Sequence, residues 1–339
     1  LAPMAATANE VTINDFNPAE ELAVTNSRVD GLEARLNNFE AGSFSETTTA
    51  SFSADFAIGA LTGKGVSSGT TDGDEDIQAA YGFQIDLNTS FTGEDSLDIS
   101  IDAGNAPTSS GSSTSPLAEF DQNATSDALT VDGVSYTFPV GDKTTVIIGD
   151  NTDGSALFST ACVYGGPSNT LDDCGNVNAG ITNGGVAVGA SYDIGGGFTA
   201  AVGYAGSETE IMTKAGTDAY GANLAYTADS YGVSLTYGNQ EAGTNGIEHN
   251  GYTALNAYYS FDNGIGISGG YEIGDIAPTS TNSQADKSVN YFVGVNGELG
   301  AGELGAALGT SGNQATNVDT EVMYEAYYSY PVNDGMTVT

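Results

Sequence analysis

Carboxylates are the chemically active side chains that dominate this sequence. Among its 339 residues, 44 are acidic, 6 are basic and one is histidine, which gives a formal net charge of −38 at pH 7. Acid–base and nucleophilic catalysis need a nucleophile, a base and a group that orients the base, and no such arrangement is recognisable. The pattern predicts a protein that is not an enzyme, needs no cofactor and, having so few basic residues, does not bind nucleic acid.

Four aspartates are candidates for a ring of carboxylates around a narrow passage. They flank or lie in a long segment between two expected strands, residues 151–183. If this segment folds into a channel, its carboxylates make the narrowest part negative and favour cations. The alternative is that these acids merely solvate an external loop. The four candidates are Asp150, Asp153, Asp172 and Asp173.

A second acidic cluster, "DGDEDI", has aspartates at alternate positions, Asp72, Asp74 and Asp76. The pattern resembles the start of a calcium-binding loop, but the downstream glycine and the terminal bidentate glutamate are not in register. A solvated acidic loop explains it more simply. These aspartates are a weak Ca²⁺ candidate, and no other metal site is predicted.

The two cysteines, Cys162 and Cys174, lie in "TACVYGGPSNTLDDCGN". In an oxidising compartment such a pair indicates a loop-closing disulfide, which contributes roughly 2–3 kcal/mol on the chain-entropy model. A metal site is the alternative, but the single histidine, His249, is far away in the sequence. Export is indicated by residues 1–8, "LAPMAATA", which end in the A-x-A pattern of a signal-peptidase site. An ordinary flexible N-terminus is the alternative to this signal-peptide remnant.

The elements that must position these residues are β-strands. The stretch "AYYSFDNGIGISGGYEI", residues 257–273, alternates apolar with small or polar residues on both sides of an Asn-Gly turn, which is typical of a β-hairpin. Apolar residues make up only 39% of the chain, and 47 residues are glycine. A closed sheet with lipid outside and water inside needs apolar residues on one face only, so we expect an outer-membrane-type barrel. A secreted β-solenoid or acidic adhesin would share the glycine and aspartate content.

The expected strands are joined by alternating long and short connections. This parity is typical of an up-and-down antiparallel membrane barrel with short periplasmic turns, whereas sandwiches and solenoids have no reason to keep it. With a further strand beginning at Gly335, the pattern predicts an all-β transmembrane barrel of about 16 strands around an aqueous channel, with the last strands cut off. The expected strands lie near 44–61, 76–91, 94–103, 129–139, 143–150, 184–194, 197–206, 217–229, 231–239, 250–262, 264–274, 286–299, 302–310 and 318–331.

In this barrel the apolar face of each strand is expected to contact lipid, and the small or polar face to line water. The expected lumen-facing residues are Asp193, Asn256, Tyr258, Glu272 and Tyr328.

A different periodicity precedes the strands. Apolar residues spaced by three and four form the a/d seam of a short coiled coil. Because this seam is too short for a stable free coiled coil, we expect it to form when three barrels bring three copies together; a lone amphipathic helix is the alternative. The expected domains are residues 1–8, the signal remnant; 9–42, a periplasmic linker and coiled-coil helix; and 43–339, a C-terminally incomplete barrel. The seam residues are Leu22, Val29, Leu32, Leu36 and Phe39.

Three motifs carry a resemblance to a known family. "LAPMAATANE", "RVDGLEARLNNFEAGSFSETT" and "LFSTACVYGGPSNTLDDCGNVNAGI" resemble the major outer-membrane porins of cyanobacteria, which are related to the carbohydrate-selective OprB-type porins and are often called iron uptake porins. The resemblance runs from the signal remnant to Thr339. Members usually carry a surface-layer-homology domain between signal and helix; the sequence lacks it between Ala8 and the heptads, so wall anchoring is not carried over.

The resemblance implies a 16-stranded, trimeric barrel in the outer membrane of a Gram-negative-type, cyanobacterial envelope. It implies transport of small hydrophilic solutes and inorganic ions, and the acidic composition adds a preference for cations. Two alternatives stay open: a sugar-selective OprB-type channel, and a structural barrel that tethers the outer membrane. Sugar channels stack pyranose rings on a track of aromatic side chains, and no continuous track is visible.

Overall fold

The computed structural model describes most of the chain in two units, Leu1–Thr49 and Ala50–Thr339. In the first unit, Asn26, Arg28 and Val29 are helical, and the Val29 side chain is exposed. The remaining heptad residues, the signal remnant and the aspartates of "DGDEDI" lie outside the described residues. The described residues are 26, 28–29, 48–59, 77–105, 120, 122–181, 185–213, 216–242, 248–277, 287–310 and 322–339.

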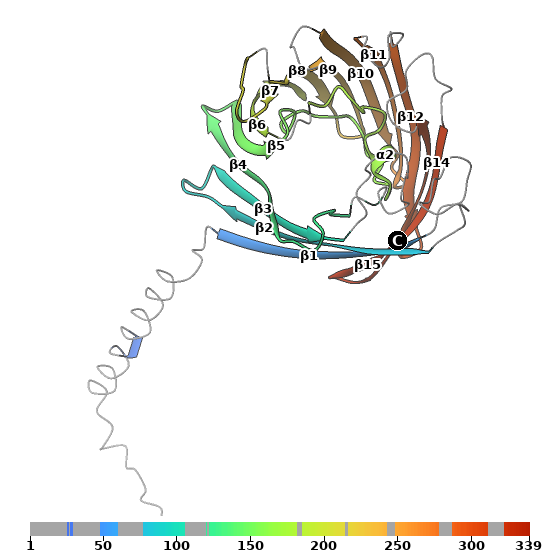
Figure 1. The fold of residues 1–339 in the computed structure, drawn as a ribbon. Helices are drawn as coiled ribbons and strands as arrows, with labels where there is room; N and C mark the ends of the chain where they lie inside the picture. Colours follow the sequence, from blue (N-terminus) through green and yellow to red (C-terminus); the bar gives the residue numbers. More distant parts are fainter. Residues whose placement is uncertain are drawn as a thin grey trace, which may run out of the picture. The chain divides into compact units, whose positions relative to one another are not determined.

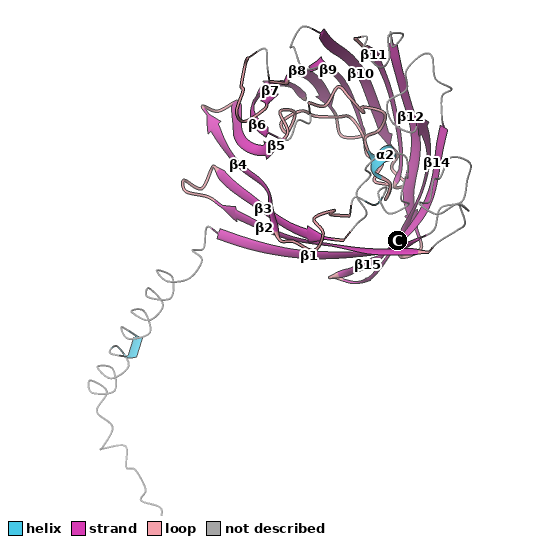
Figure 2. Ribbon diagram, viewed as in Figure 1, coloured by secondary structure: helices cyan, strands magenta, loops and turns pink. Residues whose placement is uncertain are grey.

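The second unit is one antiparallel sheet of 15 strands in which each strand pairs with its neighbours in the sequence (Figures 1 and 2). The prediction of an all-β, up-and-down sheet is therefore confirmed. Among the described residues no ladder joins β15 to β1. The strands are β1 (Thr48–Gly59), β2 (Gln78–Thr89), β3 (Ser96–Gly104), β4 (Thr130–Val140), β5 (Thr144–Thr152), β6 (Gly185–Gly195), β7 (Phe198–Gly206), β8 (Asp218–Thr227), β9 (Tyr231–Ala242), β10 (Glu248–Ser260), β11 (Ile265–Asp275), β12 (Lys287–Leu299), β13 (Gly302–Thr310), β14 (Val322–Asn333) and β15 (Met336–Val338).

A single short helix, α2 (Asn169–Asp172), lies in the connection between β5 and β6. No helix in the described part of the chain has the length and apolar character to cross a membrane. Connections at one end of the sheet are tight turns, such as residues 261–264 between β10 and β11. There Gly264 adopts a φ of +81°, a left-handed conformation that glycine adopts without steric cost. The long connections lie at the other end.

The two faces of the curled sheet differ in exposure. Apolar side chains are exposed on the outer face, including Leu235, Leu255 and Ile273, which are 48–53% accessible. Their neighbours on the inner face, such as Ser234 and Asn256, are buried. Exposure of apolar side chains on the outer face of the sheet is what a lipid-facing barrel requires.

Aromatic side chains cluster on the outer face of the sheet, near the strand ends that are joined by short turns. The ring centroids of Phe198 and Tyr226 are 4.6 Å apart, those of Tyr226 and Tyr231 5.7 Å, and those of Tyr259 and Phe261 4.7 Å. Aromatic side chains at strand ends are typical of the interfacial girdle of a membrane barrel.

Candidate functional site

The connection between β5 and β6 runs along the inside of the sheet (Figure 1). Here we call residues 153–181 the inner loop and the space enclosed by the sheet the lumen. Alternate backbone N–H groups of the inner loop donate hydrogen bonds to inward-facing side chains on three strands, β8, β9 and β11. These bonds join Ser159 to Asn223 Oδ1 on β8 (3.0 Å), Ala161 to Ser234 Oγ on β9 (2.9 Å) and Val163 to Ser268 Oγ on β11 (2.9 Å).

One buried carboxylate fixes the end of the inner loop. Glu272 on β11 is completely buried and accepts hydrogen bonds from the backbone N–H groups of Asn178 (2.7 Å) and Ala179 (2.8 Å). The amides of Asn178 and Asn290 also donate to it, at 2.8 and 2.9 Å. Burial of a carboxylate is costly unless its oxygens are hydrogen-bonded, and here neutral donors meet that need.

A second carboxylate holds the middle of the inner loop. Glu325 on β14 accepts hydrogen bonds from the Tyr164 hydroxyl (2.5 Å) and from the Ser168 backbone N–H (2.9 Å). Burial raises the pKa of the Tyr164 phenol well above its ordinary value, and the nearby Glu325 charge raises it further. The phenol therefore stays protonated and remains a donor to Glu325.

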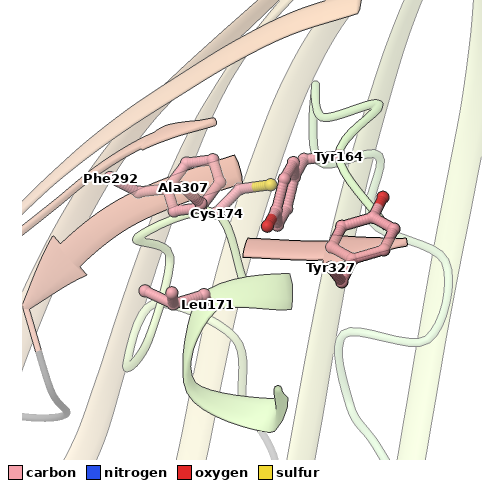
Figure 3. Packing of buried hydrophobic residues seen from close by; sticks show 6 residues of the cluster. All are labelled: Tyr164, Leu171, Cys174, Phe292, Ala307 and Tyr327. Carbon is pink, nitrogen blue, oxygen red and sulfur yellow. The ribbon is translucent and has the colours of Figure 1, made fainter. Parts of the chain in front are cut away.

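The disulfide predicted from the sequence is present and closes this part of the inner loop. Cys162 and Cys174 are bridged, with their Cα atoms 6.3 Å apart. Around the bridge, apolar side chains of the loop pack against inward-facing side chains of the sheet, as Figure 3 shows. The Tyr164 ring lies 5.2 Å from the Phe292 ring and 5.8 Å from the Tyr327 ring, centroid to centroid. The cluster consists of Tyr164, Leu171, Cys174, Phe292, Ala307 and Tyr327.

Glycine on the strands lets the inner loop approach the sheet backbone. A Cβ on Gly203 would overlap the Gly154 carbonyl, and a Cβ on Gly270 would overlap the Cys174 carbonyl. The latter carbonyl also accepts a hydrogen bond from the Asn256 amide at 2.8 Å. Much of the small polar face of β7–β13, which the sequence suggested would line water, thus contacts protein instead.

A different inner surface is found on β2 and β3. Asp86 accepts hydrogen bonds from Gln84 and Ser100 at 2.8 and 2.7 Å. Asp98 accepts them from Asn88 and Ser96 at 2.5 and 2.7 Å. Both aspartates are only half-buried. We call the surface formed by these six residues the acidic wall.

Strand register shows that the acidic wall faces the lumen. Asp98 pairs with Ser135, Ser135 with Gly149, and Gly149 with Ala187. Ala187 is buried on the inner face. Because side chains of directly paired residues point to the same face of a sheet, the acidic wall lies on the inner face too.

The inner loop carries carboxylates as well. Asp172 and Asp173, at the end of α2, have exposed side chains although the loop itself lies inside the sheet. The surrounding protein reduces hydration of the Asp173 carboxylate, and repulsion from Asp172 and Glu272 adds to this effect. Together they raise the pKa of Asp173 to about 7.

The structure corrects two predicted site residues, Asp150 and Tyr328. Asp150 lies on the outer face, since it pairs with Val134 and Val186 and shares its side of β5 with the exposed Ile148, so it does not belong to a constriction. Asp153 is exposed at the start of the inner loop.

Tyr328 also faces outward, opposite the buried Tyr327. In "YEAYYSY", tyrosines occur at both parities, so alternation alone could not identify the inner one.

The other predicted lumen residues do lie on the inner face, with different surroundings. Asn256 and Glu272 are completely covered by the inner loop. Tyr258 is half-buried and its ring lies over Gly232 of the neighbouring strand. Asp193 is exposed near the short-turn end, where it accepts a hydrogen bond from the Gly195 N–H at 2.8 Å.

Sequence reasoning missed the acidic wall. Its signal was present in "SLDISID", where Asp98, Ser100 and Asp102 alternate with Leu97, Ile99 and Ile101. Among the described residues no group of three or more histidine, cysteine or carboxylate side chains is arranged to hold a metal ion.

Comparison with known proteins identifies the fold. No protein-family model matches the chain, and no curated protein matches it in sequence. Solved structures do match: a triple mutant of the Rhodopseudomonas blastica porin aligns with a TM-score of 0.56 and 15% identity, over 85% of this chain and 92% of that one. A second solved structure, described as "Asymmetric conductivity of engineered proteins", aligns with a TM-score of 0.55 and 14% identity, over 86% of this chain and 92% of that one. At this identity the similarity establishes a porin-like β-barrel fold.

Proposed function

We propose that this protein is an outer-membrane porin, a passive channel for small hydrophilic solutes and inorganic ions with a preference for cations. The observation that carries the proposal is a lumen with one open acidic surface, the acidic wall, and an inner loop that adds two exposed carboxylates. Carboxylates around a narrow aqueous passage attract cations and repel anions.

The distribution of basic residues supports the cation preference. Within the described part of the barrel, the lysines are Lys143 and Lys287. Lys143 is in a short turn, with its ammonium 5.9 Å from the ring of the outward-facing Tyr192, and Lys287 is exposed at the first position of β12. Neither position belongs to the acidic wall or the inner loop.

The aromatic side chains favour a general pore over the alternative of a sugar channel. Tyr252, Phe292 and Tyr327 point inward, but all three are buried. Phe292 and Tyr327 pack beneath the inner loop. A sugar ring needs an exposed aromatic face on which to stack. These three rings are covered, and the half-buried Tyr258 alone makes no continuous track.

We further propose that the protein is a homotrimer in the outer membrane of a cyanobacterial envelope, with the N-terminal helix in the periplasm. The apolar outer face of the strands supports contact with lipid. The helical, exposed Val29 fits a seam that other copies would cover, and the resemblance in the sequence motifs supports the family and its organism group.

Reconstitution into a planar bilayer tests this function. Purified protein, shown to be folded by circular dichroism, is expected to give stable conductance steps and a cation-selective reversal potential across a KCl gradient. Maltose is expected to leave the current unchanged, whereas a block by maltose would favour the sugar channel. Folded protein without any conductance would overturn the pore proposal and favour a structural envelope barrel.

A further inference from the structure

A second segment folds into the lumen, on the side formed by β1–β3. It belongs to the connection between β3 and β4 and consists, in the described part of the chain, of Phe120 and residues 122–125. We call it the opposing segment. Figure 1 shows it inside the curve of the sheet, beside β2 and β3.

Three glycines, one on each strand, lie beneath the opposing segment. A Cβ on Gly59 of β1 would lie 3.9 Å from the Phe120 ring, and one on Gly82 of β2 would lie 3.6 Å from the Asn123 backbone N. On β3, a Cβ on Gly104 would overlap the Asn123 carbonyl. Gly82 and Gly104 are direct register partners, so the segment crosses the ladder at one level.

These glycines belong to the inner face. Gly82 lies two residues from the inward-facing Gln84, and Gly104 lies two residues from Asp102, which pairs with Gln84. Gly59 lies two residues from Ala57, which packs against the buried Ala80 on β2. Since residues two apart on a strand share a face, all three glycines point into the lumen.

Hydrogen bonds fix the opposing segment to the end of β3. The Gly104 N–H donates to Thr125 Oγ1 at 2.9 Å, and the Asp127 N–H donates to the Gly104 carbonyl at 2.9 Å. The Asn123 amide reaches the Phe83 carbonyl at 3.4 Å. Here β2 and β3 contribute main-chain atoms and the opposing segment contributes the side chains of Asn123 and Thr125. On the other side of the lumen, the inner loop contributes main-chain N–H groups to side chains of the strands.

We infer that the opposing segment is a second constriction element, so that the passage is bounded by two inward segments and not by the inner loop alone. Permeating ions pass between the opposing segment and the inner loop. Side chains exposed on the opposing segment, such as Ala124, then set conductance and charge selectivity. This inference rests on the proposed channel function.

A charge-probe experiment tests the inference. Ala124→Lys adds a positive charge at an exposed position of the opposing segment. It is expected to lower single-channel conductance and to reduce the cation-to-anion permeability ratio about two-fold or more. Thr209→Lys, on the exposed connection between β7 and β8, adds the same charge outside both segments and is expected to leave both quantities unchanged.

A displacement variant adds a second readout. Gly104→Val places side-chain atoms where the Asn123 carbonyl lies, so it is expected to dislodge the opposing segment and raise conductance. If wild-type channels conduct but Ala124→Lys behaves like Thr209→Lys, the inference fails and the porin function stands, whether or not Gly104→Val folds. If folded wild-type protein gives no current, the proposed function fails and the inference fails with it.

Discussion

The barrel has two inner surfaces made by the same kind of amphipathic strand, but one binds the inner loop and the other is open to the lumen. On β7–β14 the inner face presents glycine, serine, asparagine and two glutamates, Glu272 and Glu325, and these bind the inner loop. On β2 and β3 the inner face presents Asp86 and Asp98 among short hydroxyl and amide side chains, and this acidic wall is left open. Inward polarity alone therefore does not mark a pore lining.

The difference follows from what each side chain offers a neighbouring backbone. Glycine allows the inner loop to approach, serine and asparagine match its N–H and carbonyl groups, and a buried glutamate gathers several N–H donors at once. The aspartates of the acidic wall already accept hydrogen bonds from neighbouring strand residues, so they need no donors from a loop. They remain exposed to water in the lumen, where the proposed channel function would bring cations past them.

The largest effect is expected from adding a side chain where the inner loop contacts the strand backbone. Gly270→Val would overlap the Cys174 carbonyl, so it should displace the inner loop and destabilise the barrel by roughly 2–4 kcal/mol, measured by urea unfolding in detergent. Gly269→Val is the matched control, because that glycine is adjacent on the same strand but points outward, where the nearest atom beyond its neighbours would be 3.7 Å away. Equal destabilisation by both variants would contradict the close packing of the loop.

Neutralising the acidic wall should change selectivity without changing stability. Asp86→Asn combined with Asp98→Asn is expected to reduce the cation-to-anion permeability ratio several-fold, on the order of two- to five-fold, because two lumen carboxylates are lost. The measurement is the reversal potential across a KCl gradient. Asp142→Asn with Asp229→Asn, two exposed turn residues, changes the net charge equally and should leave the ratio unchanged. Equal shifts in both double variants would mean that overall charge, not the wall, sets selectivity.

Removing the charge of one loop anchor should have a moderate effect on stability. In the wild-type protein the carboxylate oxygens of Glu272 accept hydrogen bonds. Glu272→Gln replaces one of these oxygens by an NH2 group, which can only donate. A loss of roughly 1–3 kcal/mol in the free energy of unfolding is expected, together with faster hydrogen exchange at the backbone N–H groups of Asn178 and Ala179. Glu298→Gln, at an exposed position near a short turn, provides the comparison. Unchanged hydrogen exchange at these N–H groups in the Glu272→Gln variant would show that Glu272 does not hold the inner loop in place.

A smaller effect is expected from pH. Because the pKa of Asp173 is raised to about 7, its carboxylate is charged above that pH and neutral below it. Cation preference should therefore decrease as the pH falls from 8 to 6, and Asp173→Asn should remove this step. A raised carboxyl pKa also means that this group favours the folded state less as the pH rises from about 4 towards 7. The same pH step in both proteins would assign it to another group.

Much of the fold could be predicted from the sequence, because alternation with a period of two, Asn-Gly turns and long–short parity are local signals. The strand near 264–274 and the observed β11, Ile265–Asp275, nearly coincide. The Cys162–Cys174 bridge also followed from local spacing and was confirmed.

The site was harder to predict because its contacts join residues far apart in the sequence. Alternation placed Glu272 on the inner face, but nothing local shows that Asn178 and Ala179 cover it. Tyr328 was assigned to the wrong face because a run of tyrosines satisfies both parities. The acidic wall was overlooked although its alternation is as regular as that of any other strand.

The inner surface of β7–β14 is covered by the inner loop, whereas the acidic wall is open to the lumen. Cysteine accessibility tests this difference most directly, since both native cysteines are bridged. A positively charged methanethiosulfonate reagent, applied to single channels, is expected to modify Asp98→Cys and reduce the current stepwise, and to leave Ser234→Cys, beneath the inner loop, unmodified. Rapid modification of Ser234→Cys with no effect on Asp98→Cys would contradict the account.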